Sequence, residues 1–384
     1  MKKTVLCLSF IFALLFSATI GVALVNLATA SLFWVQALPE VIIESDGSIT
    51  GLETGFVNRT GDTYALTANV EGYSLVIERS NIVFDGTGHT INTTMGDTSA
   101  LELTDVTGVT VKNLEVVGRY TGIYLYYSSN CLITNVKTNN RIYLTDGSNF
   151  NTIVGNTVKR LHIGLAGGAS NNLAVNNTVL QELHVGGYNN RLYQNNFFLK
   201  ELSGICSDNF WDNGSVGNYW GNYSIDCPAA AENGNTGIGD TPYVIERTPY
   251  TTKEFPNAIN IDRYPLLYPW GTPELAMFEA DNVTYSQSYP LNFTVNKPTQ
   301  WMGYSLNGEA NVTFTGNVTL SGLAPGLYNL TVYAIDVYGV NGVSETVYFT
   351  VNEPFPTALV TTASAASVAA IGVALLVYFK KRKH

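Results

Sequence analysis

The sequence predicts an all-β protein: a right-handed parallel β-helix, then a small antiparallel β-sandwich and a C-terminal transmembrane helix. Three observations predict this class. Short apolar triplets recur about every 20 residues in the middle of the chain, alternating strands replace them after residue 272, and an uncharged run lies near the end. At roughly 100 to 200 residues per domain, the 384 residues leave room for two or three domains.

The repeat is carried by two sets of short strands. One set has the form Leu/Ile-x-Leu/Ile/Val and starts at Leu75, Leu101, Ile123, Ile142, Leu161 and Leu183. The other set ends in asparagine, at Asn113, Asn135, Asn156, Asn177 and Asn195. Each unit is too short for a crossover helix, and Gly or Asn fits corners that need positive φ. An antiparallel sandwich would need hairpin turns between neighbouring strands instead, so stacked coils are favoured.

Several motifs resemble one family of β-helix surface proteins. The opening motifs are Val41–Ile49, Gly61–Thr67, Val76–Gly86 and Gly122–Asn130, and the closing motifs are Asn209–Asp212, Gly217–Tyr223, Gly237–Ile245 and Asp262–Leu266. Together they are similar to NosD-like right-handed β-helix proteins, a family named for a periplasmic copper-binding protein that assists maturation of a copper reductase. The resemblance covers about residues 40 to 270. It implies the fold and raises a copper-handling role, but this fold also occurs in carbohydrate-binding and sugar-hydrolase modules.

The segment 273–353 has the texture of a β-sandwich. Its strands alternate apolar and polar residues, and Asn307-Gly308 predicts a type I′ hairpin turn. Residues 323–332 resemble the E-to-F corner of immunoglobulin-like or fibronectin-type modules, where the hydroxyl of a tyrosine, here Tyr328, bonds the corner backbone. Trp301 is the expected core aromatic.

The two ends of the chain point to a membrane. Residues 1–30 resemble a signal peptide, with an uncleaved anchor as the alternative, and residues 31–272 form the predicted β-helix. Residues 357–379 carry no charge and are long enough to span a bilayer, and the basic tail 380–384 places the preceding chain outside the cell. Without its six terminal cations the chain has 14 basic and 30 acidic residues, or −16. This charge argues against nucleic acid as a partner and fits a single-pass cell-membrane protein with an extracellular N-terminal ectodomain.

One outer face of the coils is the candidate binding surface. If the apolar residues of each triplet point inward, the middle residues form an outward stripe of Glu102, Tyr124, Tyr143, His162 and His184. Arg141, Arg160 and Glu182 lie beside it. Tyrosine faces suit sugar rings, and Arg and Glu suit hydroxyls or acidic groups. The alternative is a solvated ladder that only steadies neighbouring coils.

Two metal sites are hypotheses from the same residues. His162 and His184 are expected to lie close enough to share copper or zinc, with Glu182 as a third ligand. Asp226, Asn233, Asn235 and Asp240 lie in a Gly-rich stretch that offers oxygen ligands to Ca²⁺, although their spacing is not that of an EF-hand. The same residue types also make Asx turns.

The predicted function is non-catalytic adhesion or envelope carbohydrate binding, with surface polysaccharide or envelope proteins as partners. A polysaccharide hydrolase, lyase or epimerase is one alternative, but these enzymes need paired acidic groups. In residues 121–199 the only acidic residues are Asp146 and Glu182. A copper-handling accessory protein is the other alternative.

Cysteines and asparagines supply the remaining expectations. The spacing supports one disulfide, Cys206 to Cys227, and Cys131 is expected to be a buried small residue. Glycosylation acceptor triplets start at Asn58, Asn92, Asn176, Asn213, Asn222, Asn282, Asn292, Asn311, Asn317 and Asn329.

Overall fold

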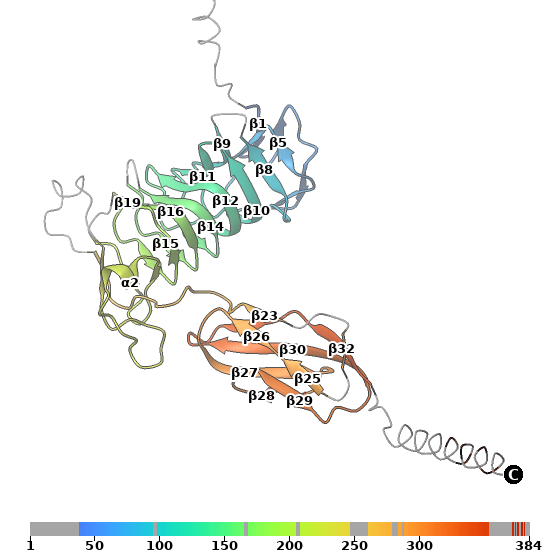
Figure 1. Ribbon diagram of the computed structural model, residues 1–384. Helices are drawn as coiled ribbons and strands as arrows, with labels where there is room; N and C mark the ends of the chain where they lie inside the picture. The colour runs from blue at the N-terminus through green and yellow to red at the C-terminus, as the bar shows by residue number, and fades with distance from the viewer. Residues whose placement is uncertain are drawn as a thin grey trace, which may run out of the picture. The chain divides into compact units, whose positions relative to one another are not determined.

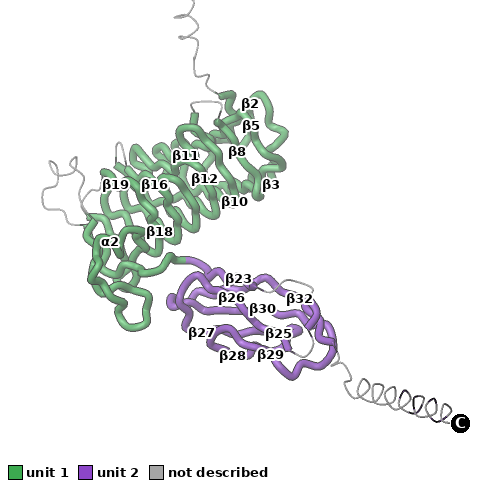
Figure 2. The backbone as a smooth tube through the Cα atoms, in the orientation of Figure 1, with its two compact units in different colours: residues 1–270 green, residues 271–384 purple. Residues whose placement is uncertain are grey.

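The computed structural model describes residues 38–94, 98–164, 168–204, 208–245, 260–278, 283–285 and 288–352, together with residues 371, 373, 375, 378 and 380. Its contacts divide the chain into two units, which meet between Trp270 and Gly271 (Figure 2). The predicted signal peptide, residues 1–30, lies outside the described residues.

The first unit is a parallel β-helix of about seven turns, as predicted (Figure 1). Its strands stack in three columns. The first contains β1 (Glu40–Ile43), β6 (Ser74–Ile77), β9 (Ser99–Thr104), β11 (Thr121–Tyr126) and β19 (Glu201–Ser203). The second contains β4 (Thr63–Leu66), β7 (Val83–Asp85), β13 (Thr152–Val154), β15 (Leu173–Val175) and β17 (Arg191–Tyr193), and the third contains β5 (Val70–Glu71), β8 (Thr90–Thr93), β18 (Asn196–Phe197) and β20 (Tyr219–Trp220).

Four long strands pass around the corners between columns. They are β10 (Thr110–Gly118), β12 (Leu132–Thr145), β14 (Thr157–Ile163) and β16 (Thr178–Val185), and each pairs in parallel with the next coil. Antiparallel pairs occur at both ends of the unit. At the N-terminal end, β1 pairs with β2 (Ile49–Gly51) and β4 pairs with β3 (Val57–Thr60), and at the other end β21 (Tyr243–Ile245) pairs with β22 (Asn260–Asp262). The short helix α2 is Tyr223–Asp226.

The first set of triplets stacks in the predicted register. Leu75 pairs with Leu101, Leu101 with Ile123, Ile123 with Ile142, and the column continues to Leu202. From Leu75 to Leu183 these residues are at most 1% exposed and belong to the continuous core of the unit, and the partly buried Leu202 packs against it. Alternation therefore separates inward from outward residues as the sequence indicates.

The predicted alignment of the second set, which ends in asparagine, is wrong by one residue. Thr134 pairs with Val154, so Asn135 aligns with Gly155 and not with Asn156. The corner column with positive φ contains Asn113, Asn135, Gly155, Asn176 and Gln194. Asn113 and Asn135 thus belong to this corner, where Asn and Gly tolerate the left-handed conformation.

The following position forms a buried ladder, which we call the inner amide ladder: Asn156, Asn177, Asn195 and Asn218. Each is at most 1% exposed. The main-chain N–H of each of the first three donates to Oδ1 of the next, over 2.9–3.1 Å, and each of the three also donates Nδ2–H to that oxygen. The ladder satisfies backbone and amide groups in the interior, where an unpaired polar group is costly.

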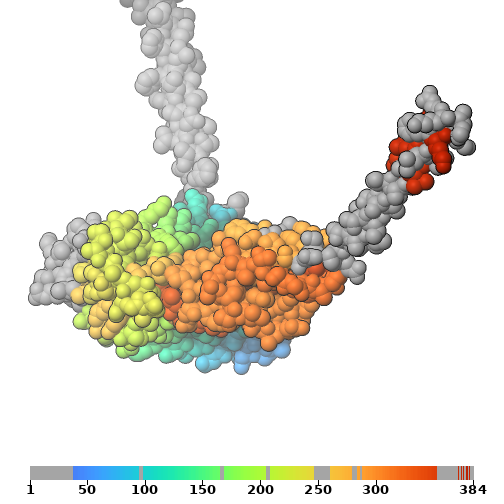
Figure 3. All heavy atoms as spheres, turned by 60° about the horizontal axis from the view of Figure 1, so that its bottom comes forward, coloured from blue at the N-terminus to red at the C-terminus, as the bar shows by residue number. Residues whose placement is uncertain are grey.

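The second unit is a two-layer β structure with its own core. One sheet holds β24 (Val283–Tyr285), β27 (Thr299–Leu306), β28 (Val312–Thr313), β30 (Gly326–Asp336), β31 (Asn341–Val343) and β32 (Val347–Val351). The pairs β23 (Leu275–Met277) with β26 (Phe293–Val295), and β25 (Ser288–Leu291) with β29 (Val318–Ser321), are antiparallel and supply Leu291, Phe293 and Leu320 to the same core. The outer surface of this unit is orange in Figure 3.

Four predicted features of the second unit can be compared with its structure. Tyr328 donates its hydroxyl to Ala324 O at 2.8 Å, as a tyrosine corner requires. Asn307 and Gly308 both have positive φ, as a type I′ turn requires. The expectation that Trp301 fills the core is wrong: Tyr289 and Phe349 stack there, with ring centroids 4.0 Å apart. The expected all-antiparallel pairing also has an exception, because β24 pairs in parallel with β32.

Within the described residues, no helix is long and apolar enough to cross a membrane. The predicted span, residues 357–379, lies mostly outside them. Ile371, Val373, Leu375 and Tyr378 are described, and each is helical and exposed. The span therefore stays a prediction.

Candidate functional site

The predicted outward stripe is one continuous column, which we call the outer ladder: Glu102, Tyr124, Tyr143, His162, His184 and Ser203. Each member pairs directly with the next across parallel strands. The column runs along β9, β11, β12, β14, β16 and β19, whose ribbons lie side by side in Figure 1. Parallel pairing at about 4.8 Å therefore brings side chains of the same face into contact.

Tyrosines dominate one end of the outer ladder. The rings of Tyr124 and Tyr143 have centroids 5.3 Å apart at 35°. Tyr126 lies 6.1 Å from Tyr124, and Tyr127, 55% exposed, packs edge-on against Tyr126 at 4.6 Å. Tyr126 is not among the site residues predicted from the sequence, although its spacing of two from Tyr124 places it on the same face. Offset, partly exposed rings of this kind offer an extended apolar platform.

Two carboxyl groups lie near the tyrosines. Oε1 of Glu102 accepts the hydroxyl of Thr104 at 3.0 Å, and burial raises the pKa of Glu102. Burial also raises the pKa of Tyr124 to about 12, with further increases from Tyr143, Asp146 and Glu102. Tyr124 is therefore a neutral phenol at any physiological pH, able to donate a hydrogen bond.

A second column runs beside the outer ladder. Arg141 pairs with Arg160, Arg160 with Glu182, and Glu182 with Glu201. Nε of Arg160 lies 3.5 Å from Oε2 of Glu182. The guanidinium of Arg141 lies 5.9 Å from the centre of the Tyr143 ring. The structure thus brings all five predicted ligand-binding residues, Tyr124, Tyr143, Arg141, Arg160 and Glu182, to one face.

The two histidines are more buried than an outward stripe suggests. His162 is 4% exposed and His184 8%. The Gly204 backbone, with φ +58°, passes so close to His184 that a Cβ there would overlap the ring, so glycine permits this cover. The pKa of each imidazole is lowered to about 4, mainly by burial, with smaller contributions from Arg141 and Arg160 at His162 and from His162 at His184. Both rings are neutral at pH 7.

Polar contacts around the histidines are incomplete. The two rings have centroids 5.7 Å apart. Nδ1 of His184 lies 3.1 Å from Ser203 Oγ, whereas Nε2 of His162 lies 3.0 Å from Glu182 Oε1 without hydrogen-bonding geometry. Nδ1 of His162 has no hydrogen-bond partner among the described residues.

No described residues form a group of three or more His, Cys, Asp or Glu side chains suited to a metal ion. In the predicted calcium stretch, Asp226 accepts the Tyr243 hydroxyl, and Asp240 accepts Ala231 N and Thr241 Oγ1. The backbone of Asn233 donates its N–H to Ile238 O and accepts the Thr236 hydroxyl at its carbonyl oxygen. Asn235 is exposed. These oxygens shape the turns of the cap, as Asx-turn residues do.

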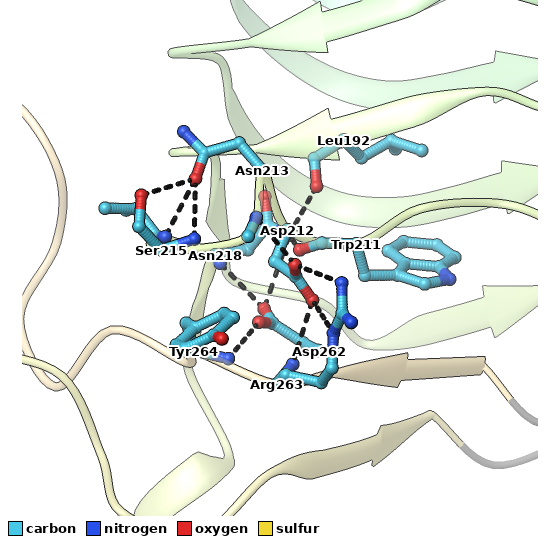
Figure 4. A network of polar contacts seen from close by, with 11 residues as sticks. Leu192, Trp211, Asp212, Asn213, Ser215, Asn218, Asp262, Arg263 and Tyr264 are labelled. Carbon is cyan, nitrogen blue, oxygen red and sulfur yellow. Dashed lines mark hydrogen bonds and ion pairs between the residues drawn. The ribbon is translucent and has the colours of Figure 1, made fainter.

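The closing motifs build the end of the β-helix. Trp211 and Trp220 are 1% and 3% exposed, and their ring centroids are 5.7 Å apart. The fully buried Asp262 accepts hydrogen bonds from Asn218 N at 2.7 Å and Tyr264 N at 3.1 Å (Figure 4). It also accepts one from Trp220 Nε1 at 2.8 Å. The inner amide ladder therefore ends on a carboxylate.

Two opposing influences act on the Asp262 carboxyl. Burial raises its pKa to about 7, while the hydrogen bonds from Trp220, Asn218 and Tyr264 lower it. The neighbouring Asp212 receives two bonds from the Arg263 guanidinium, at 2.7 and 2.9 Å, and its pKa is lowered. The sequence motif alone did not reveal that Asp262 is the end of the amide ladder.

The cysteine and glycosylation predictions stay open. Cys131 is buried with a free thiol. Cys227 also has a free thiol in the structure, and Cys206 lies outside the described residues, so the proposed disulfide stays a prediction. Asn58, Asn176, Asn213, Asn222, Asn311 and Asn317 are exposed, Asn92, Asn292 and Asn329 are partly buried, and Asn282 is not described.

No protein-family model matches this chain, and no curated protein has a significant match to it. The NosD-like family indicated by the sequence motifs therefore stays a prediction.

Proposed function

We propose that this protein is a non-catalytic, carbohydrate-binding β-helix held at the cell surface by a C-terminal membrane anchor. The observation that carries the proposal is the Tyr124–Tyr143 pair, two adjoining rings on the outer face with Tyr126 and Tyr127 beside them. A sugar chain presents apolar ring faces at regular intervals, and stacked coils present tyrosines at regular intervals.

The composition of the chain supports display outside the cell. The uncharged segment 357–379, followed by four consecutive cations, is the pattern of a span with a cytoplasmic tail. The exposed acceptor triplets, such as those of Asn58 and Asn176, fit the same location. The sandwich then spaces the β-helix from the membrane.

A glycan array probed with the full-length protein tests this function. The protein is extracted from membranes with detergent, and recovery of the full chain from the soluble fraction without detergent would contradict the anchor. We expect Tyr124→Ala and Tyr143→Ala each to weaken binding roughly 5- to 150-fold, because each removes a stacking face worth about 1 to 3 kcal/mol if it resembles base–aromatic stacking. Phe150→Ala removes an exposed aromatic, 59% exposed, outside the ladder and serves as the control.

A polysaccharide-cleaving enzyme is the second candidate, and one observation favours it. Glu102 lies next to Tyr124 and has a raised pKa, which suits a general acid. The array glycans are therefore also assayed for new reducing ends. Cleavage that disappears in Glu102→Gln would replace the binding proposal with an enzymatic one, and stoichiometric copper lost in His162→Ala would replace it with a metal-handling role.

A further inference from the structure

The middle coils carry a charge opposite to that of the whole chain. Between Thr110 and Lys200 the basic residues are Lys112, Arg119, Lys137, Arg141, Lys159, Arg160, Arg191 and Lys200, and the acidic ones are Glu115, Asp146 and Glu182. Eight against three gives +5, whereas the chain as a whole has a net charge of −10. The coils from Thr110 to Lys200, which hold Tyr124, Tyr143, His162 and His184 of the outer ladder, are therefore a basic part of an acidic protein.

Some of these cations have carboxylate partners. Lys112 lies 3.1 Å from Asp85, and Lys137 lies 3.6 Å from Glu115. Such exposed pairs on the coil surface need no ligand to explain them. Beside the outer ladder the pairing is less complete.

Arg141 and Arg160 are direct neighbours on adjoining strands. Like charges placed opposite each other in a sheet destabilise it. Within the described part of the chain, Glu182 is the one carboxylate that forms an ion pair with either arginine, at 3.5 Å from Arg160, which also donates to Asn140 Oδ1 at 3.1 Å. Nε of Arg141 donates to Tyr120 O at 3.0 Å. Among the described residues, none accepts a hydrogen bond from the two terminal nitrogens of Arg141, and none forms an ion pair with it.

The Arg141 guanidinium lies at the Tyr143 end of the tyrosine platform, and Arg160 is its neighbour on the adjoining strand. Arg141 lies 5.9 Å from the centre of the Tyr143 ring, and Arg141 and Arg160 are near enough to His162 to lower the pKa of that imidazole. The buried Nδ1 of His162, without a partner among the described residues, lies in the same column. At the other end of the platform, Tyr124 pairs with Glu102 on the adjoining strand. The platform is thus basic at one end and acidic at the other.

We propose that the outer ladder binds an acidic polysaccharide, with the anionic group of one sugar held by Arg141 and Arg160 and its rings stacked on Tyr143 and Tyr124. A planar guanidinium pairs with a carboxylate or sulfate through two parallel hydrogen bonds. This inference rests on the proposed carbohydrate-binding function and adds the charge class of the ligand. It also adds a polarity, since the anionic sugar lies at the Tyr143 end.

Matched polymers test the charge class with the full-length protein. The probes are polygalacturonate, its methyl ester with the same backbone and no charge, and a sulfated neutral glucan. We expect polygalacturonate to bind at least tenfold more tightly than its ester, with an affinity that falls as salt rises. Tight binding of the sulfated glucan alone would keep the anionic class and assign the group to sulfate.

Charge variants test the residues. Arg141→Gln is expected to weaken polygalacturonate binding at least tenfold and to leave binding of the ester unchanged. Lys137→Gln removes the same charge from the same strand, β12, and is expected to have no effect. Circular dichroism melts check that both variants fold.

The outcomes separate this inference from the function on which it rests. Equal binding of the acid and its ester, weakened by Tyr143→Ala and unaffected by Arg141→Gln, would overturn the acidic class and leave carbohydrate binding standing. Binding of none of these polymers, nor of any array glycan, would overturn both.

Discussion

Two ladders run along the same β-helix, and they differ in how completely their polar groups are paired. In the inner amide ladder, Asn177 receives two hydrogen bonds at Oδ1 and donates through Nδ2 to Ile153 O, Val175 O and Asn195 Oδ1. In the outer ladder, His162 has neither ring nitrogen in a hydrogen bond with a described residue. Both columns repeat with the coil period, so repetition alone does not indicate a binding function. The carbohydrate-binding proposal rests instead on incomplete pairing beside an aromatic platform.

The largest expected effect comes from breaking the inner amide ladder. Asn177→Ala removes a fully buried side chain and takes away the partner of the Asn156 N–H, of one Asn156 Nδ2–H and of Ile153 O. Since each unsatisfied buried group costs about 1 to 3 kcal/mol, we expect unfolding free energy to fall by about 5 kcal/mol. Urea denaturation followed by circular dichroism measures it.

Asn149→Ala is the matched control for this variant. Its side chain is partly exposed and accepts one hydrogen bond, from Ser170 N at 2.7 Å, which water can replace. We expect a loss of about 1 kcal/mol or less. Equal losses in the two variants would mean that the buried ladder contributes no more than an ordinary surface turn.

A fall in pH is expected to change the stability contributions of the two ladders in opposite directions. In the folded chain the pKa values of His162 and His184 are about 4, below the ordinary histidine value of 6.5. The unfolded chain takes up protons below pH 6.5 while the folded chain does not, so stability is lost as the pH falls from 6.5 to 4. At 1.36 kcal/mol per pKa unit, each histidine accounts for about 3 kcal/mol of this loss of stability.

Asp262, at the end of the inner amide ladder, has the opposite effect on how stability depends on pH. Its pKa is raised from 3.8 to about 7, so the folded chain keeps a proton that the unfolded chain releases. Its contribution is complete below pH 4 and is lost as the pH rises to 7. We expect the double variant His162→Gln, His184→Gln to become more stable as the pH falls from 6.5 to 4, measured by urea midpoints. An unchanged pH profile in the double variant would show that the histidines do not cause the acid sensitivity.

Much of the fold follows from the sequence because alternation and coil period are local properties of the chain. The triplets at Leu101, Ile123 and Ile142 determine which residues face inward, and the outer ladder follows from the same count. Packing over the outer face is not local. The burial of His184 depends on Gly204, and the acceptor for the Asn218 backbone is Asp262, 44 residues later. The one-residue error at Asn113 arose because asparagine serves both the positive-φ corner and the buried column, and composition does not distinguish them.

The smallest expected effect concerns stability at the outer ladder itself. Tyr143 and Ile142 are neighbours on β12, with Ile142 fully buried and Tyr143 partly exposed. Ile142→Ala opens a cavity in the core and is expected to cost about 2 to 5 kcal/mol. Tyr143→Ala removes a cross-strand contact worth about 1 kcal/mol or less. A ring retained mainly to bind a ligand should be nearly dispensable for folding. If both substitutions lowered the urea midpoint equally, Tyr143 would be a structural rung, and the contrast between the two ladders would disappear.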